Sequence, residues 1–217
     1  MSALQMTCGF PPGTSGTPVL ETDRLLLRSP KLDDAKVIAR LANNRKIAEM
    51  TALIPHPYGA DDARAWIESL SEEGSGWTFA ITAKAEAGGA LIGACGYGRR
   101  HDAFLLEEPE IGYWIGEPYW GHGYATEAVR AVIDHLFSVT DLDALSAGCR
   151  VTNLASRRVI EKCGFQWTGA ALFRVRALGA SVPADRFRLE RSIWASLRAW
   201  GKSGMPKIAT AKKRAGR

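Results

Sequence analysis

Residues 118–128 read Pro-Tyr-Trp-Gly-His-Gly-Tyr-Ala-Thr-Glu-Ala, and this stretch decides the fold. Before it, residues 111–115 form a short apolar run that is typical of a strand. After it, apolar side chains recur at helical spacing, which predicts an amphipathic helix with one continuous buried face. These apolar positions are Ala125, Ala128, Val129, Val132, Ile133, Leu136 and Phe137. Gly121 and Gly123 are therefore expected in the turn that leads from a strand into a helix N-terminus.

This glycine turn has the features of an anion site. The first amides of a helix have no intrahelical acceptor, and the helix dipole favours negative charge there. Glycine also lets the backbone approach a ligand closely. A purely structural tight turn would explain a Gly-x-Gly pair equally well, so the motif alone does not decide between the two. We interpret the turn as a candidate diphosphate cradle.

Two other nucleotide-binding motifs can be compared with the same stretch. A P-loop requires Gly-Lys-Ser/Thr after four spacer residues, and the sequence contains none. A dinucleotide fingerprint requires a third glycine at position 126, where Thr126 stands. That fold also needs more parallel βαβ units than this chain supplies. Both readings are disfavoured.

Working outward, periodicity and turn residues predict a mixed α/β fold. Three consecutive strands with short connections predict antiparallel hairpins, and a later strand-helix-strand unit predicts a right-handed parallel crossover. Besides the long helix after Gly123, helices are expected around 33–41, 61–70 and 153–163, and strands around 24–28, 77–81, 91–97, 111–115, 142–151, 170–176 and 186–194.

The 217 residues suit one domain with a core of its own, because 46% of them are hydrophobic and 24% are charged. We expect this domain over 20–198, between a disordered arm rich in Gly and Pro (1–19) and a basic disordered tail (199–217). Six of the 28 basic residues follow Trp200 with no acidic residue among them, so residues 1–200 carry a net charge of −1. A solvated end explains the tail, and contact with RNA or ribosomes is the alternative.

Targeting and metal signals are missing from the sequence. The first ten residues contain neither a basic n-region nor an apolar h-region, and no apolar run approaches the ~18 residues that span a membrane. The four cysteines are scattered and form no metal-binding or redox pair with each other or with the four histidines. We therefore expect a cytoplasmic protein with reduced cysteines, no metal site and no membrane contact.

Residues 120–125 resemble the GNAT acetyltransferase signature Gln/Arg-x-x-Gly-x-Gly/Ala, with Trp120 in the Gln/Arg place. Three further segments, 20–28, 110–115 and 153–165, are similar to the branch that acetylates the amino-terminal alanine or serine of ribosomal proteins. The likeness covers about 21–197 in the right order. It implies the GNAT fold, with a mostly antiparallel central sheet, a βαβ crossover and flanking helices. It also implies an acetyl-CoA-dependent N-acetyltransferase.

The resemblance also implies a binding site for acetyl-CoA. Amides of the glycine turn would bind the diphosphate, the preceding strand would pair with pantetheine through its main chain, and an asparagine would donate to pantetheine. Without the resemblance, an ordinary core strand and a helix-capping Asn153 explain the same residues. The cofactor-binding residues so implied are Tyr113, Trp114, Ile115, Gly121, His122, Gly123, Tyr124, Ala125, Thr126 and Asn153.

Two residues are candidates for acid and base. Many relatives place a tyrosine seven residues after the asparagine to protonate the leaving thiolate, but Ile160 stands there, and Ser156 is the available hydroxyl. Glu110 is the candidate general base, acting through a water. A solvated residue near a strand start is the competing interpretation of Glu110. No nucleophile motif is present, so direct attack in a ternary complex is expected.

The shortage of bases favours an acceptor that deprotonates easily. An α-amine has a pKa of about 7.7–8.0 and a lysine about 10.4, so the α-amine needs roughly 3 kcal/mol less work at neutral pH. A protein N-terminus is therefore the predicted acceptor, with a small-molecule amine or a non-catalytic acyl-CoA-binding module as alternatives. Residues 43–58, with His56 and Tyr58, and the hairpin loop 177–183, beside Arg174 and Arg176, are expected to select it. The oligomeric state is left open, a homodimer included.

Overall fold

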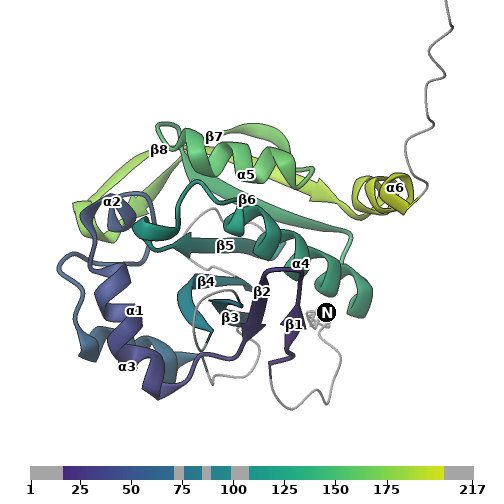
Figure 1. Ribbon diagram of the computed structural model, residues 1–217. Helices are drawn as coiled ribbons and strands as arrows, with labels where there is room; N and C mark the ends of the chain where they lie inside the picture. The colour runs from purple at the N-terminus through teal and green to yellow at the C-terminus, as the bar shows by residue number, and fades with distance from the viewer. Residues whose placement is uncertain (1–16, 71–75, 85–88, 99–107, 203–217) are drawn as a thin grey trace, which may run out of the picture.

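The computed structural model describes residues 17–70, 76–84, 89–98 and 108–202, which form an eight-stranded sheet flanked by helices (Figure 1). The strand order is β1-β2-β3-β4-β5-β6-β8-β7, and within this sheet only β5 and β6 run parallel. The predicted mixed, mostly antiparallel sheet is confirmed. The strands are β1 (Leu20–Glu21), β2 (Leu25–Arg28), β3 (Trp77–Ala83), β4 (Ala90–Gly98), β5 (Glu110–Ile115), β6 (Ala144–Arg150), β7 (Gln166–Val175) and β8 (Ala180–Glu190).

Helices cover both faces of the sheet. Neighbouring strand residues point to opposite faces, and apolar side chains on each face pack against helices. Phe79 and Ile81 of β3 pack in one core cluster with α4, whereas Ala80 between them packs in a second cluster with α1 and α3. The helices are α1 (Ala35–Ala42), α2 (Arg45–Ala48), α3 (Ala60–Ser69), α4 (Tyr124–Val139), α5 (Leu154–Lys162) and α6 (Arg191–Lys202), with 3-10 turns η1 (Leu32–Asp34), η2 (Glu117–Tyr119) and η3 (Arg176–Leu178).

The parallel pair β5–β6 is short and opens into a gap. Its register contains only Glu110 opposite Ser146 and Ile111 opposite Ala147. On its other edge, β5 stays paired with β4 as far as Ile115. Beyond Ile111 the two parallel strands therefore separate, while α4 connects them across one face of the sheet.

The chain after β8 differs from the prediction. Instead of a strand to residue 194, α6 begins at Arg191 and carries Ile193 and Trp194 onto the core cluster. Arg191 donates to the carbonyls of Phe137 and Leu142 at 2.7 Å each, so it satisfies backbone acceptors near the end of α4 as the chain turns. The predicted tail overlaps α6 over 199–202, and its remaining residues lie outside the described ranges.

Two short elements, β1 and α2, were also not predicted. β1 consists of two residues, and α2 of one helical turn capped by the side chain of Asn44. Neither is long enough to show a periodicity. Residues 1–16 of the predicted arm lie outside the described ranges, and 17–19 form no helix or strand. Over the described ranges, none of the helices has the length and apolar character needed to traverse a bilayer.

Candidate functional site

The glycine turn has the backbone geometry that only glycine adopts readily. Gly121 and Gly123 have φ angles of +79° and +80°, and Gly123 is the N-cap residue of α4. A Cβ added at Gly121 would meet no atom within 4 Å, and one at Gly123 would come no closer than 3.6 Å, to Arg24 Nη2. The turn therefore leaves open space beside the first amides of α4.

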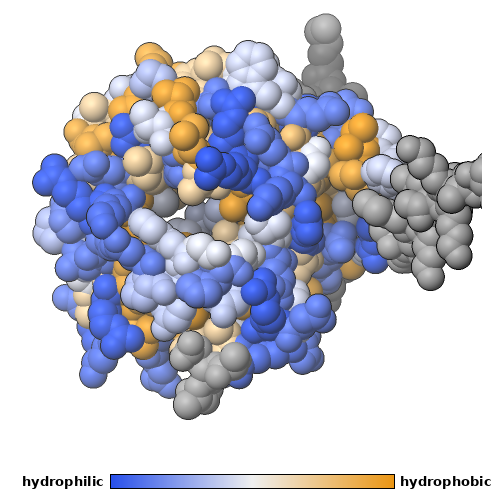
Figure 2. Space-filling view, turned by 45° about the horizontal axis from the view of Figure 1, so that its top comes forward, coloured by the Kyte–Doolittle hydropathy of each residue, from blue (hydrophilic) through white to orange (hydrophobic). Residues whose placement is uncertain are grey.

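That space belongs to a cavity of about 1490 Å³, and Figure 2 shows a hollow near the middle of the visible face. Its walls come from α4, α5, β4, β5 and the segment before α3. Among the predicted site residues, those that line it are Glu110, Tyr113, Trp114, Ile115, Gly121, Gly123, Tyr124, Ala125, Thr126, Asn153 and Ser156. His122 is outside this lining, and its ring stacks on that of Tyr124 with centroids 5.6 Å apart.

The cavity reaches both faces of the sheet at the gap beside β5. Tyr113 packs with the cluster beneath α4, whereas Trp114 packs with the cluster of α1 and α3. Both side chains line the same cavity, as does Gly112, where an added Cβ would meet nothing within 4 Å. A chain-like ligand can therefore lie along β5 where β6 has separated from it.

Trp120 holds the glycine turn against the end of β5. Its indole nitrogen donates to the carbonyl of Ile115 at 2.6 Å, although 43% of the residue is exposed. The side chain in the Gln/Arg place thus anchors the turn by a bond that the sequence did not predict. It also engages the Ile115 carbonyl, which was expected to be available for pairing with a ligand.

Ser156 and Tyr113 form a pair of hydroxyls in the cavity wall. Their oxygens lie 2.8 Å apart, and the Tyr113 hydroxyl also lies 3.1 Å from the Ser156 carbonyl, to which it can donate. Burial raises the pKa of Tyr113 well above its ordinary value, so its proton stays on the phenol at neutral pH. Sequence reasoning assigned Tyr113 a main-chain role only and missed its hydroxyl.

Asn153 caps α5 and thereby fixes Ser156. Its Oδ1 accepts the backbone N–H of Ser156 at 3.0 Å, which is the capping contact expected from the sequence. This bond sets the start of the helix on which the Ser156 hydroxyl is carried. Asn153 and Ser156 thus reach the cavity from the same helical turn.

Glu110 is half-buried at the start of β5 and lines the cavity. By strand alternation it shares a face with Trp114, opposite to the face of Tyr113. Its neighbour Glu108 is bound elsewhere, in an ion pair with Arg188 at 2.8 Å, and Glu107 lies outside the described residues. One carboxylate and one hydroxyl pair therefore border the gap from opposite faces.

The far wall of the cavity is formed by residues 50–55 with Tyr58, Trp66, Phe173 and Arg176. Burial raises the pKa of Tyr58 to about 12; Asp62 raises it further, and Arg176 opposes the shift. His56 is exposed and does not line the cavity, and neither does any residue of 177–183. Segment 43–58 thus borders the cavity in both halves, through Lys46 and Ile47 and through 50–55 with Tyr58, whereas the hairpin contributes Arg176 rather than its loop.

Metal-binding groups are sparse in the part of the chain that is described. No cluster of three or more His, Cys, Asp or Glu side chains occurs there. Cys95, Cys149 and Cys163 are buried free thiols, and Cys8 lies outside the described ranges. Burial raises the pKa of Cys149 and of Cys163 to about 11, so both thiols are protonated at neutral pH.

Comparison with known proteins yields one family and several relatives. Residues 24–166 match the model of the acetyltransferase (GNAT) domain. The chain is 29% identical over 176 residues to an N-acetyltransferase of Bacillus licheniformis named p20, covering 78% of this chain and 94% of the relative. It is 35% identical over 75 residues to the ribosomal-protein-serine acetyltransferase of Escherichia coli, covering 35% of this chain and 41% of that protein.

A solved structure has the same fold. RimJ of Mycobacterium smegmatis, in complex with a CoA disulfide, superposes with a TM-score of 0.67 at 21% identity, covering 82% of this chain and 89% of that one. At this identity the likeness concerns the fold alone. The glycine turn, the gap beside β5 and the capped α5 described above lie within or next to the matched residues 24–166.

Proposed function

The chain belongs to the GNAT acetyltransferase family, and from this premise we propose that it moves the acetyl group of acetyl-CoA onto the α-amine of a protein N-terminus. The observation that carries the proposal is the cavity that joins the glycine turn of α4 to the gap between β5 and β6. One end offers main-chain amides to a diphosphate, and the gap gives a thioester access to both faces of the sheet. Two relatives support it, one named as an N-acetyltransferase and the other as a ribosomal-protein-serine acetyltransferase.

The proposed binding mode for acetyl-CoA uses mainly backbone groups. The amides of 121–126 hold the diphosphate, and Gly121 and Gly123 keep the approach clear of side chains. The main chain of Tyr113 and Trp114 pairs with pantetheine along β5, with Asn153 beside it. In this scheme Ile115 contributes less than its neighbours, because its carbonyl already accepts from Trp120.

The proposed chemistry is a direct attack assisted from both sides. Glu110, acting through a water, takes a proton from the incoming amine. An amide at the gap stabilises the oxyanion that forms on the thioester carbonyl. Ser156 then donates its hydroxyl proton to the leaving thiolate, and Tyr113, 2.8 Å away, orients that hydroxyl and can replace the proton. The amine nitrogen gains the acetyl group and the sulfur leaves as a thiol.

An N-terminal α-amine suits this site better than a lysine side chain. Glu110 is the candidate base, and the α-amine requires roughly 3 kcal/mol less deprotonation work at neutral pH. The cavity also extends along a mixed wall at 50–55 and Arg176, where the first residues of a peptide can lie. A free small amine would leave most of that wall unused.

An acceptor screen tests the proposal. Release of free coenzyme A is followed with unblocked peptides that begin with Ser or Ala, and with the same peptides acetylated at the N-terminus and carrying one internal lysine. We expect turnover of the unblocked peptides about a hundredfold above that of the blocked ones, since the two amines differ by more than two pKa units and each unit is a tenfold change in neutral amine. Faster turnover of lysine peptides, polyamines or amino acids would assign the enzyme a different acceptor.

A further inference from the structure

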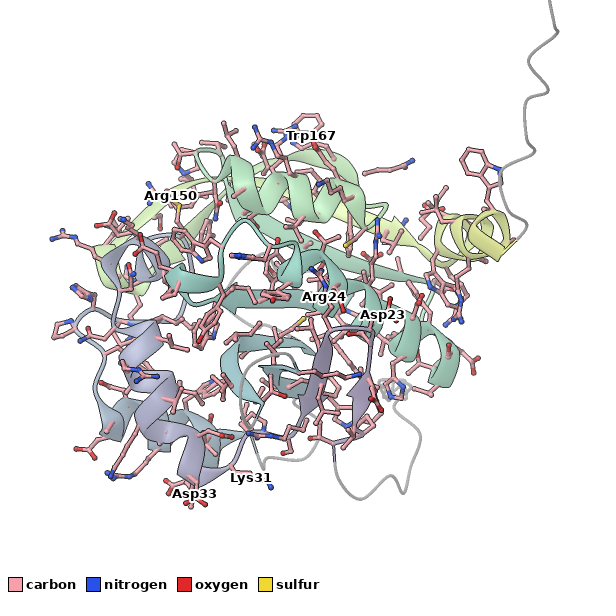
Figure 3. All side chains as sticks on the ribbon, in the orientation of Figure 1. Asp23, Arg24, Lys31, Asp33, Arg150 and Trp167 are labelled. Atoms are coloured by element: carbon pink, nitrogen blue, oxygen red, sulfur yellow. The ribbon has the colours of Figure 1, made fainter. Side chains whose placement is uncertain are left out.

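Arg24 lies in the turn between β1 and β2, beside the first turn of α4 (Figures 1 and 3). Its Nη1 donates to the carbonyl of His122 at 2.9 Å. Its Nε and Nη2 reach Glu127 Oε2 at 2.7 and 2.6 Å, and its guanidinium carbon lies 4.9 Å from the centre of the Tyr124 ring. One side chain thus contacts three residues of the glycine turn and the helix start.

The bond to His122 determines where the next amide points. The carbonyl of His122 and the N–H of Gly123 belong to one planar trans peptide and point in opposite directions. With the carbonyl held towards Arg24, the Gly123 N–H is directed to the other side of the peptide plane. A donor on the carbonyl also polarises the peptide and strengthens its N–H as a donor.

The bonds to Glu127 reduce the repulsion between its carboxylate and a diphosphate bound at the start of α4. A carboxylate in the first helical turn stabilises the helix dipole, but it also repels a bound phosphate. Glu127 accepts from Thr22 Oγ1 at 2.6 Å and from the backbone N–H of Arg24 at 3.0 Å, in addition to the guanidinium contacts. Its charge is therefore balanced by groups on the β1–β2 hairpin.

We infer that Arg24 is a positioning residue for acetyl-CoA, which holds the His122–Gly123 peptide in the orientation that binds the diphosphate and neutralises Glu127 beside it. The inference rests on the proposed function, in which the glycine turn binds that diphosphate. Arg24 itself is half exposed and acts through the turn rather than on the acetyl group. All of these side-chain contacts are made with residues about a hundred positions away in sequence.

The experiment compares two acetyl donors in the Arg24→Met variant. With acetyl-CoA, KM should rise about tenfold or more while kcat stays within about twofold, because the His122–Gly123 peptide loses its charge-assisted hydrogen bond and Glu127 loses its counter-charge. With acetyl-pantetheine, which lacks the diphosphate, kcat/KM should equal that of the wild type. A merely structural role would lower activity with both donors alike and would overturn the inference.

Matched variants separate the two parts of the role. Arg28→Met removes a bidentate ion pair with Asp34 near the same hairpin and should change neither donor's kinetics. Adding Glu127→Gln to Arg24→Met should restore only part of the acetyl-CoA affinity, because the His122 carbonyl still lacks its donor. Complete recovery would contradict the peptide-holding part of the inference.

A conservative variant distinguishes a loss of positioning from a loss of folding. Arg24→Lys keeps the charge near Glu127 but has no planar fork for two acceptors, so we expect an intermediate KM for acetyl-CoA and an unchanged unfolding temperature. Wild-type kinetics in Arg24→Lys and Arg24→Met together would overturn the inference. If the wild-type protein itself failed to use acetyl-CoA, the proposed function would fall instead, so the two failures are distinguishable.

Discussion

The two ends of the cavity are built from different parts of the chain. The end at which we propose that acetyl-CoA binds, called the donor end, consists of the glycine turn and the first turn of α4, where backbone amides and two positive-φ glycines dominate. The end at which we propose that the peptide lies, called the acceptor end, consists of side chains from 50–55, α3 and the β7–η3 region. One short segment makes the first end, whereas the second requires segments more than a hundred residues apart.

This difference determines which substitutions each end of the cavity can tolerate. A site made of backbone amides depends on φ angles and on open space, so most side chains around it can vary without loss of binding. In a site made of side chains, each substitution alters one of the contacts that select the ligand. At the donor end we therefore expect few substitutions to reduce activity, but each of them strongly. At the acceptor end we expect many substitutions to reduce activity, but each of them weakly.

The strongest test of that contrast is Gly123→Val. A β-branched residue at φ +80° is strained, and its Cβ borders the space next to the helix amides. We expect KM for acetyl-CoA to rise about a hundredfold, an effect on the order of 3 kcal/mol from strain and obstruction together. Steady-state kinetics with acetyl-CoA varied at saturating peptide measure it.

Gly89→Val is the matched control for Gly123→Val. Gly89 has φ +74° and room for an added Cβ, with no atom within 4 Å, but it precedes β4 and does not line the cavity. Both variants should lose similar thermal stability, whereas the Gly89 variant should keep the wild-type KM. Equal KM values in the two variants would refute a backbone-built donor end.

The glycine turn and α4 could be predicted from sequence because the information for them is local. The glycines fix the turn, and the apolar spacing from Ala125 to Phe137 identifies a helix, which the structure confirms as α4. The three hairpin strands and the parallel crossover followed from loop lengths in the same way. In each case the physical signal lies in consecutive elements and the short loops between them.

The remaining features could not be predicted, because periodicity reports which residues are buried but not what they contact. The hydroxyls of Tyr113 and Ser156 are 43 residues apart in sequence, and Arg24 and His122 are 98 apart. The strand predicted up to residue 194 was wrong because the helical period of α6 begins only at Arg191, next to a genuine strand. Such contacts depend on the assembled sheet.

A second test addresses the boundary between the ends. Glu110→Gln should lower kcat/KM for the peptide about a hundredfold at pH 7, within the usual range for a general base, and leave acetyl-CoA affinity unchanged. The deficit should shrink as pH rises past about 8, because the α-amine then loses its proton without help. A pH series of initial rates for both proteins measures the difference.

Glu108→Gln is the control for Glu110→Gln. Glu108 lies two residues before Glu110 in the sequence, and its carboxylate is paired with Arg188. The variant therefore makes the same charge change outside the proposed chemistry. Its rates should follow the wild type at every pH. A deficit in the Glu110 variant that is constant with pH would mean that Glu110 orients the peptide rather than accepting its proton.

The smallest predicted effect concerns the hydroxyl pair of Tyr113 and Ser156, which lies outside the glycine turn. Tyr113→Phe removes the hydroxyl that lies 2.8 Å from Ser156 Oγ, and it should lower kcat about fivefold to tenfold, the range for one hydrogen bond of about 1 kcal/mol. Ser156→Ala should lower kcat further, without raising KM for acetyl-CoA. Because both residues serve one proton transfer, the double variant should be no slower than Ser156→Ala alone. Additive losses in kcat would show that Tyr113 and Ser156 act independently. A rise in KM for acetyl-CoA without a fall in kcat would show instead that both side chains serve acetyl-CoA binding.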